Sequence, residues 1–177
     1  MLRLFAAIYP PAEAAGAMID ELRTYELPEH RETPADQLHL TMQFIGDTPG
    51  SALDDTIESV QRAAAGLERF ELKPSWFITL PEEGFARLVA VETDEPPALL
   101  EIKRRLVTRL ARTKRERSRG FRPHLTVCRF RNPARLQAPL REETEIPAFS
   151  VDRITLMKST LSPSGAEHKE LAAAQLE

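Results

Sequence analysis

The chain has a single cysteine and no long hydrophobic run. Cys128 cannot form an internal disulfide, and a lone cysteine favours a reducing compartment. No apolar stretch approaches the roughly 20 residues that a membrane-spanning helix needs. The N-terminus carries Arg3 and Glu13 around a short apolar segment and lacks the pattern of a secretory signal. These absences exclude disulfide-rich and membrane-spanning classes, and we expect a cytoplasmic protein.

Length and composition favour one hydrophobic core. The chain has 177 residues, of which 42% are hydrophobic, and this is enough to bury a single core of ordinary size. No low-complexity segment or flexible linker divides it. We therefore expect one domain over residues 1–177, and a monomer.

Two short motifs repeat the same chemistry. His39-Leu40-Thr41 and His124-Leu125-Thr126 lie 85 positions apart (124 minus 39) in a chain with four histidines. In a β-strand, residues i and i+2 point to the same side. Each motif therefore places an imidazole and a hydroxyl side by side on one sheet face, with the leucine in the opposite layer.

The surroundings of the motifs repeat as well. In each half an apolar strand pattern is followed by a Pro-Pro pair that opens a helical pattern, as expected for proline in the first turn. His39 follows Leu4 by 35 positions, and His124 follows Leu88 by 36 positions. The matched spacing predicts two duplicated lobes that bring both histidine-bearing strands to one cleft. The alternative is that the motifs lie on ordinary strands far apart.

The chain resembles the two-histidine (2H) phosphoesterases, and within them the RNA 2′,3′-cyclic phosphodiesterases, also called 2′-5′ RNA ligases. The similar segments are 39–46 (HLTMQFIG), 121–129 (FRPHLTVCR) and 161–165 (LSPSG). The resemblance implies a two-lobed fold around a central cleft. One departure stands out: where the family commonly has Arg-Val-x-Trp, this chain has Arg87-Leu88-Val89-Ala90, without the tryptophan.

The two histidines suit hydrolysis of a cyclic phosphodiester without a metal. One imidazole can take a proton from water while the other gives a proton to the departing alkoxide, because an unperturbed histidine titrates near pH ~6.5. Thr41 and Thr126 can donate hydrogen bonds to the nonbridging phosphate oxygens. The resemblance implies that His39 is the general acid toward O3′ and that His124 is the base, giving a 2′-phosphomonoester; symmetry alone does not assign the roles.

Other residues are weaker candidates. By resemblance Arg129 and Arg87 bind substrate, although Arg129, five residues after His124, needs a bulge or a strand end to reach the same face. Phe44 and Trp76 can stack a base or belong to the core. We interpret Cys128 as a buried packing residue. The remaining histidines, His30 and His168, are interpreted as surface residues.

A basic segment precedes the second motif. Between Glu101 and Arg122 there are ten basic and two acidic residues, a net +8 (ten minus two), in a chain of net charge −3. For residues 103–112 an apolar helical stripe indicates an ordinary solvated helix face. For residues 113–122, where Lys114, Arg115, Arg117 and Arg119 lie, a loop that binds RNA and a solvated charge run are both open.

Periodicity and breakers predict an α+β fold of two pseudo-symmetric lobes, with mainly antiparallel sheet and outer helices. We expect three helices, near residues 12–23, 53–65 and 98–113, and eight strands, near 3–9, 39–45, 69–72, 76–80, 86–91, 125–130, 149–161 and 167–172. Turns are expected at 81–84 and 162–165.

The predicted function is hydrolysis of RNA 2′,3′-cyclic phosphate ends, with no cofactor and no metal, since a third ligand and close histidine spacings are lacking. RNA or a cyclic nucleotide is the expected partner. The alternatives are a module that binds RNA ends or nucleotides without turnover, a zinc-dependent hydrolase, and a related 2H enzyme acting on another cyclic phosphate or a 2′-5′ linkage.

Overall fold

The computed structural model describes residues 1–118, 120–162 and 165–177. Among these residues the helices are α1 (Ala12–Leu22), α2 (Leu53–Ala64), α3 (Pro97–Leu110) and α4 (Lys114–Ser118), with 3₁₀ turns η1 (Ala35–Gln37) and η2 (Gly50–Ala52). The strands are β1 (Leu2–Ile8), β2 (His30–Glu32), β3 (Leu40–Thr48), β4 (Phe70–Leu72), β5 (Pro74–Leu80), β6 (Ala86–Thr93), β7 (His124–Ala134), β8 (Arg141–Glu143), β9 (Phe149–Val151), β10 (Arg153–Ser162) and β11 (Gly165–Gln175).

One antiparallel sheet runs through both halves of the molecule. Its order is β11-β10-β1-β3-β7-β6-β5-β8, with β2 paired to β7 beside β3. The order is symmetric about the junction of β3 and β7. Outward from this junction, β3 is followed by β1, the first strand of its repeat, and β7 is followed by β6, the first strand of the other repeat. Two further strands complete each side. The first lobe is β11-β10-β1-β3 and the second is β7-β6-β5-β8, which confirms the α+β fold with two pseudo-symmetric lobes.

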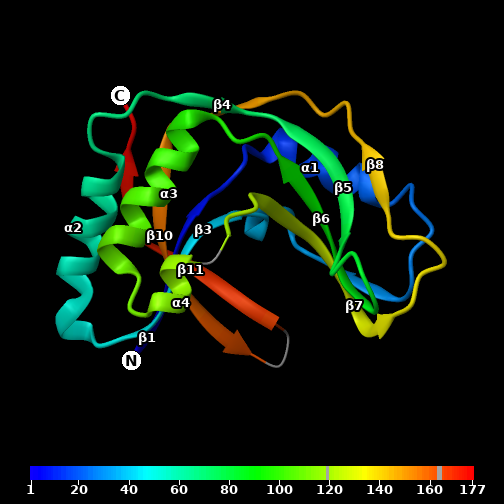
Figure 1. The fold of residues 1–177 in the computed structure, drawn as a ribbon, viewed down its shortest axis with the longest axis horizontal. Helices are drawn as coiled ribbons and strands as arrows, with labels where there is room; N and C mark the ends of the chain where they lie inside the picture. The colour runs from blue at the N-terminus through cyan, green and yellow to red at the C-terminus, as the bar shows by residue number, and fades with distance from the viewer. Residues whose placement is uncertain (119, 163–164) are drawn as a thin grey trace.

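The helices cover only one side of each lobe (Figure 1). Helices α2 and α3 pack against β3, β10 and β11 of the first lobe, while α1 packs toward β7 of the second. The main core therefore contains one alternating set of strand residues, including Leu4, Ala6 and Ile8 from β1 and Val89 and Val91 from β6. The opposite set, with Phe5, Ala7 and Tyr9, lies on the face that no helix covers. This uncovered face carries the motifs.

The three long helices and the main strands lie where the sequence predicts them. Three differences follow from tertiary contacts. The strand expected over 149–161 is divided into β9, which pairs with β4, and β10, which pairs with β1 and β11. The short strands β2 and β8 were not predicted, because three residues show no periodicity and each strand exists through pairing with β7 or β5. The expected loop 113–122 contains α4, in which Glu116 accepts backbone hydrogen bonds from Arg112 and Thr113 and so closes a helical turn.

The predicted turns have different outcomes. The turn at residues 81–84 joins β5 to β6, as predicted. The turn predicted at 162–165 includes residues 163 and 164, which lie outside the described residues, but the strands on either side of it pair as an antiparallel hairpin. In Figure 1 this hairpin of β10 and β11 projects away from the helices.

Candidate active site

The two motifs meet where the lobes join. Leu40 of β3 pairs directly with Leu125 of β7, and both side chains are fully buried. In an antiparallel pair the neighbours of the paired residues point to the other face. The motif histidines and threonines therefore lie together on the uncovered face, on strands roughly 5 Å apart.

Both imidazoles are held by the backbone in the same way. Nδ1 of His39 lies 2.7 Å from the carbonyl oxygen of Gln37, and Nδ1 of His124 lies 2.7 Å from the carbonyl oxygen of Arg122. A carbonyl oxygen can only accept, so each Nδ1 carries the hydrogen. Within the part of the chain that the structure describes, neither Nε2 makes a hydrogen bond, so both can contact a ligand. The partner carbonyl is two residues upstream in both repeats, and His30 of β2 makes the same contact with the carbonyl of Pro28.

The two histidines differ in their surroundings. The ring of His39 is packed against Phe5, Tyr9 and His168, with centroid distances of 5.1, 5.4 and 5.0 Å. Among the residues that the structure describes, His124 has no such ring contact. The duplicated motifs therefore hold two chemically different imidazoles.

The prediction that His168 is a surface residue is wrong, and His30, predicted in the same way, is half-buried as well. His168 lies in β11, half-buried, and its Nδ1 is 3.4 Å from the Tyr9 hydroxyl. Register explains its position: β11 pairs with β10 and β10 with β1, which brings residues from the end of the chain beside Phe5. In the sequence, the alternating pattern near the C-terminus predicts a strand, but it does not indicate which residues this strand lies beside.

Burial lowers the pKa of His39 to about 4. The hydrogen bond to the Gln37 carbonyl acts in the opposite direction, and the positive charges of His168, Arg129 and His124 lower the pKa further. Burial also lowers the pKa of His168. In the ligand-free protein His39 is therefore neutral at pH 7 and its Nε2 can accept a proton.

A β-bulge brings Arg129 to the site. Along β6 and β7, Ala90 pairs with Thr126 but the next residue, Val89, pairs with Cys128, so one extra residue is inserted in β7. The insertion reverses the alternation after Thr126 and turns Arg129 to the same face. Arg129 is exposed and close enough to lower the pKa of His39. The spacing of Arg129 from His124 requires a bulge for both side chains to share a face, and β7 contains that bulge.

The first lobe contains the matching bulge. Ala7 pairs with Thr41 and Ala6 with Gln43, so β3 also gains a residue after its threonine. Phe44 is thereby the counterpart of Arg129 and is 64% exposed, with its ring 6.5 Å from that of Phe5. Phe44 is thus an exposed residue and not part of the core.

The other substrate-binding candidate, Arg87, lies apart from the histidines. It is exposed near the start of β6, and its neighbour Leu88 is the residue that pairs with Arg129. Among the described residues, no hydrogen bond, ion pair or ring contact joins Arg87 to either motif. Trp76 is half-buried in β5, with the guanidinium of Arg141 4.8 Å from its ring centroid.

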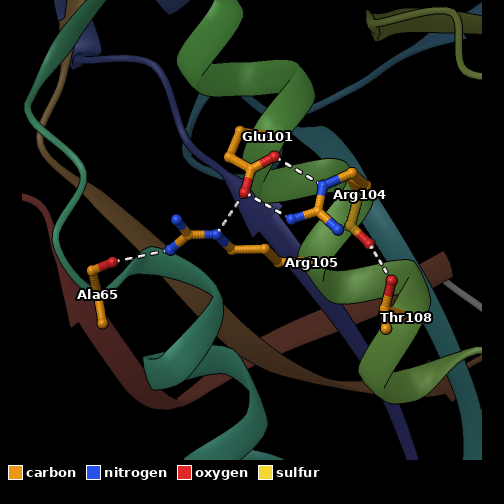
Figure 2. Close-up of polar contacts among 5 residues, drawn as sticks. All are labelled: Ala65, Glu101, Arg104, Arg105 and Thr108. Atoms are coloured by element: carbon orange, nitrogen blue, oxygen red, sulfur yellow. Dashed lines mark hydrogen bonds and ion pairs between the residues drawn. The ribbon is translucent and has the colours of Figure 1, made fainter.

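Many side chains of the basic segment form hydrogen bonds within the protein, several of them to distant parts of the chain. Figure 2 shows Glu101 accepting hydrogen bonds from both Arg104 and Arg105, while Arg105 also donates to the carbonyl of Ala65. A solvated helix face fits the exposed Arg104, whereas Lys103 and Arg112 donate to the backbone carbonyls of Met42 and Asp47 in β3. In α4, Arg117 donates to the carbonyl of Ala111. Arg119, the last residue named for an RNA-binding loop, lies outside the described residues.

The remaining sequence candidates have structural roles. Cys128 is fully buried, and burial raises the pKa of its thiol to about 11, which leaves it protonated and unreactive at neutral pH. Among the described residues, no three His, Cys, Asp or Glu side chains lie close enough to share a metal ion. Within the same residues, no helix has the length and apolar composition to cross a membrane.

Comparison with known proteins agrees with this arrangement. The profile of the 2′-5′ RNA ligase superfamily matches residues 10–162, which include both motifs. The chain belongs to the 2′-5′ RNA ligase superfamily. Among the curated members, RNA 2′,3′-cyclic phosphodiesterase of Thermus thermophilus is 29% identical over 171 residues, covering 93% of this chain and 85% of the relative. The Escherichia coli enzyme of the same name is 33% identical over 133 residues, covering 72% and 71%.

Solved structures with the same fold include two bacterial proteins. The crystal structure of TT0787 of Thermus thermophilus superposes with a TM-score of 0.83 at 25% identity, covering 98% of this chain and 97% of that one. E. coli LigT complexed with 3′-AMP gives a TM-score of 0.79 at 24% identity, covering 99% and 98%. The fold of this chain is therefore shared with these structures over nearly its whole length.

Proposed function

We propose that this protein hydrolyses 2′,3′-cyclic phosphate ends of RNA to 2′-phosphomonoesters, without a metal, by acid–base catalysis between His39 and His124. One observation carries the proposal: both imidazoles are fixed through Nδ1 and leave Nε2 for a ligand, on the same face of strands that meet at Leu40 and Leu125. The names of the curated relatives support the same reaction.

The reaction needs two proton transfers. One imidazole takes a proton from water, and the resulting hydroxide oxygen forms a bond to phosphorus. The bond from phosphorus to O3′ breaks, and the other imidazole gives its proton to the O3′ alkoxide. Thr41 and Thr126 donate hydrogen bonds to the nonbridging oxygens, where negative charge grows. Arg129, beside His39, stabilises the same negative charge. We assign Arg87 a smaller role in binding, because among the described residues it makes no contact with either motif.

The division of labour depends on the substrate. Family resemblance makes His39 the acid and His124 the base, yet burial leaves His39 neutral at pH 7 in the ligand-free protein. The negative charge of a bound phosphodiester favours the protonated imidazole. We therefore propose that His39 takes up its proton as the substrate binds. The proposal includes RNA as the partner, a monomeric protein and a cytoplasmic location.

Turnover of a nucleoside 2′,3′-cyclic monophosphate in the presence of EDTA tests this function. His39→Ala and His124→Ala should each lower kcat/KM by roughly 10²–10⁴-fold, as for loss of a general acid or base. His30→Ala is the control, since His30 is half-buried in β2 and its Nδ1 also contacts a backbone carbonyl, that of Pro28.

The outcomes separate the alternatives. Near-normal turnover in either folded single variant refutes the histidine pair. Binding without turnover by the wild-type protein indicates a binding module, and loss of activity in EDTA indicates a metal-dependent hydrolase. A 3′-phosphate product, identified by chromatography, would reverse the assigned leaving group.

A further inference from the structure

An arginine that belongs to neither motif lies at the junction of the lobes. Strand β2 lies along the edge of β7 beside β3, and Arg31 pairs directly with Arg129. Its neighbours His30 and Glu32 pair with Phe130 and Cys128, which are buried. Because paired residues share a face, Arg31 is on the uncovered face together with Arg129 and the motif residues.

The position of β2 is well anchored. Thr33 donates from its backbone N–H to the carbonyl of Val127 and from its hydroxyl to the carbonyl of Thr126, both at 2.8 Å. On the covered face Glu32 binds Arg23 of the α1 C-terminus through two hydrogen bonds of 2.9 Å. The backbone at Arg31 is therefore held directly beside the second motif.

Two arginines opposite each other are unfavourable in a sheet, since like charges at paired positions destabilise it. Within the described residues, the guanidinium of neither Arg31 nor Arg129 donates a hydrogen bond to a carboxylate or a carbonyl. The guanidinium of Arg31 also reaches the first lobe: a β-carbon at Gly165 of β11 would lie 2.8 Å from its Nη1. The side chains of Arg31 and Arg129 are both exposed, and among the described residues neither has an anionic partner.

We propose that Arg31 binds the phosphodiester on the 5′ side of the terminal nucleotide of an RNA substrate, while Arg129 faces the reacting phosphate. The inference rests on the proposed function and adds the recognition of a polynucleotide to it. Arg129 is the nearer of the two to His39, since its charge lowers the pKa of that residue. Arg31 and Arg129 lie on adjacent strands, whose backbones are roughly 5 Å apart. This separation is comparable to the spacing of successive phosphates in RNA.

A single added phosphate tests the inference. A nucleoside 2′,3′-cyclic monophosphate lacks the phosphate that Arg31 binds, and the same nucleotide with a 5′-phosphate contains it. The wild-type protein should hydrolyse the 5′-phosphorylated substrate with a kcat/KM about 10- to 100-fold higher, as expected for a hydrogen bond to a charged group. Arg31→Ala should abolish this preference, because it should lower kcat/KM for the 5′-phosphorylated substrate by about 10- to 100-fold more than for the unphosphorylated one.

Two further variants make the comparison specific. Arg109→Ala removes the same charge from the exposed last turn of α3, on the covered side of the first lobe, and should keep the full preference. Arg31→Lys should keep only part of it, because an ammonium cannot form the paired hydrogen bonds of a guanidinium. Thermal unfolding of Arg31→Ala should not occur at a lower temperature than that of the wild type, since the change relieves a like-charge pair.

Each outcome of these measurements supports or overturns either the inference or the proposed function. Equal rates of the wild-type protein on the two substrates overturn the inference, as do equal losses on both substrates in Arg31→Ala. No turnover of either substrate by the wild type refutes the proposed function instead. With longer single-stranded RNA, Arg31→Ala should also flatten the dependence of log affinity on log salt by about 0.7, and an unchanged slope contradicts a phosphate contact.

Discussion

Acid should destabilise this protein through His39 in particular. The pKa of His39 is about 4 in the folded protein because its ring is buried among Phe5, Tyr9 and His168, whereas in the unfolded chain it is near the ordinary 6.5. Between these values the unfolded chain binds a proton that the folded protein does not. The stabilisation is therefore complete above pH ~6.5 and is lost as the pH falls toward 4.

The magnitude follows from the two pKa values. Linkage of folding to this one proton gives a loss of about 2 kcal/mol at pH 5 and about 3 kcal/mol at pH 4, relative to pH 7. At a urea m-value of about 2 kcal/mol/M, the loss at pH 5 moves the unfolding midpoint by about 1 M. His168 adds to the loss in the same direction, since burial lowers its pKa too.

Urea unfolding of the wild type and of His39→Gln at pH 7 and pH 5 isolates the contribution of this residue. Glutamine does not titrate and can still donate to the Gln37 carbonyl, so the variant should lose about 2 kcal/mol less between the two pH values. Titrations of groups that do not interact with His39 cancel in the difference. His30→Gln, which removes an imidazole outside the ring cluster, is the control. Equal losses in wild type and His39→Gln would refute the burial argument.

Three further predictions concern the same face. Thr41→Ala should lower kcat by less than loss of a histidine does, about 10²-fold or below, and Thr41→Ser should restore it if the hydroxyl is the active part. His168→Phe keeps a ring against His39 but removes a titrating neighbour, so NMR titration should give His39 a higher pKa; an unchanged value would contradict the charge effect. Leu125→Ala, at the fully buried junction, should lower the free energy of unfolding by about 2–5 kcal/mol in denaturant titrations.

The sequence alone determined the repeat and its chemistry. His39, Thr41, His124 and Thr126 are in strands of period two, and a local rule, alternation, is enough to put each pair on one face. The helices α1, α2 and α3 could also be predicted from the sequence, because an apolar stripe and a proline in the first turn are local features of a short segment. Family resemblance added the fold of the whole chain.

The tertiary structure decided which residues join these pairs. Arg129 reaches the site only through a bulge, whose existence depends on the register between β6 and β7. His168 stands beside His39 because three strands pair in a fixed order, and Arg31 lies opposite Arg129 because β2 fills the edge that β3 leaves. Register and strand order are non-local properties, which no pattern in a short segment specifies. The same packing makes two identical motifs unequal, since it surrounds one imidazole with rings and leaves the other open.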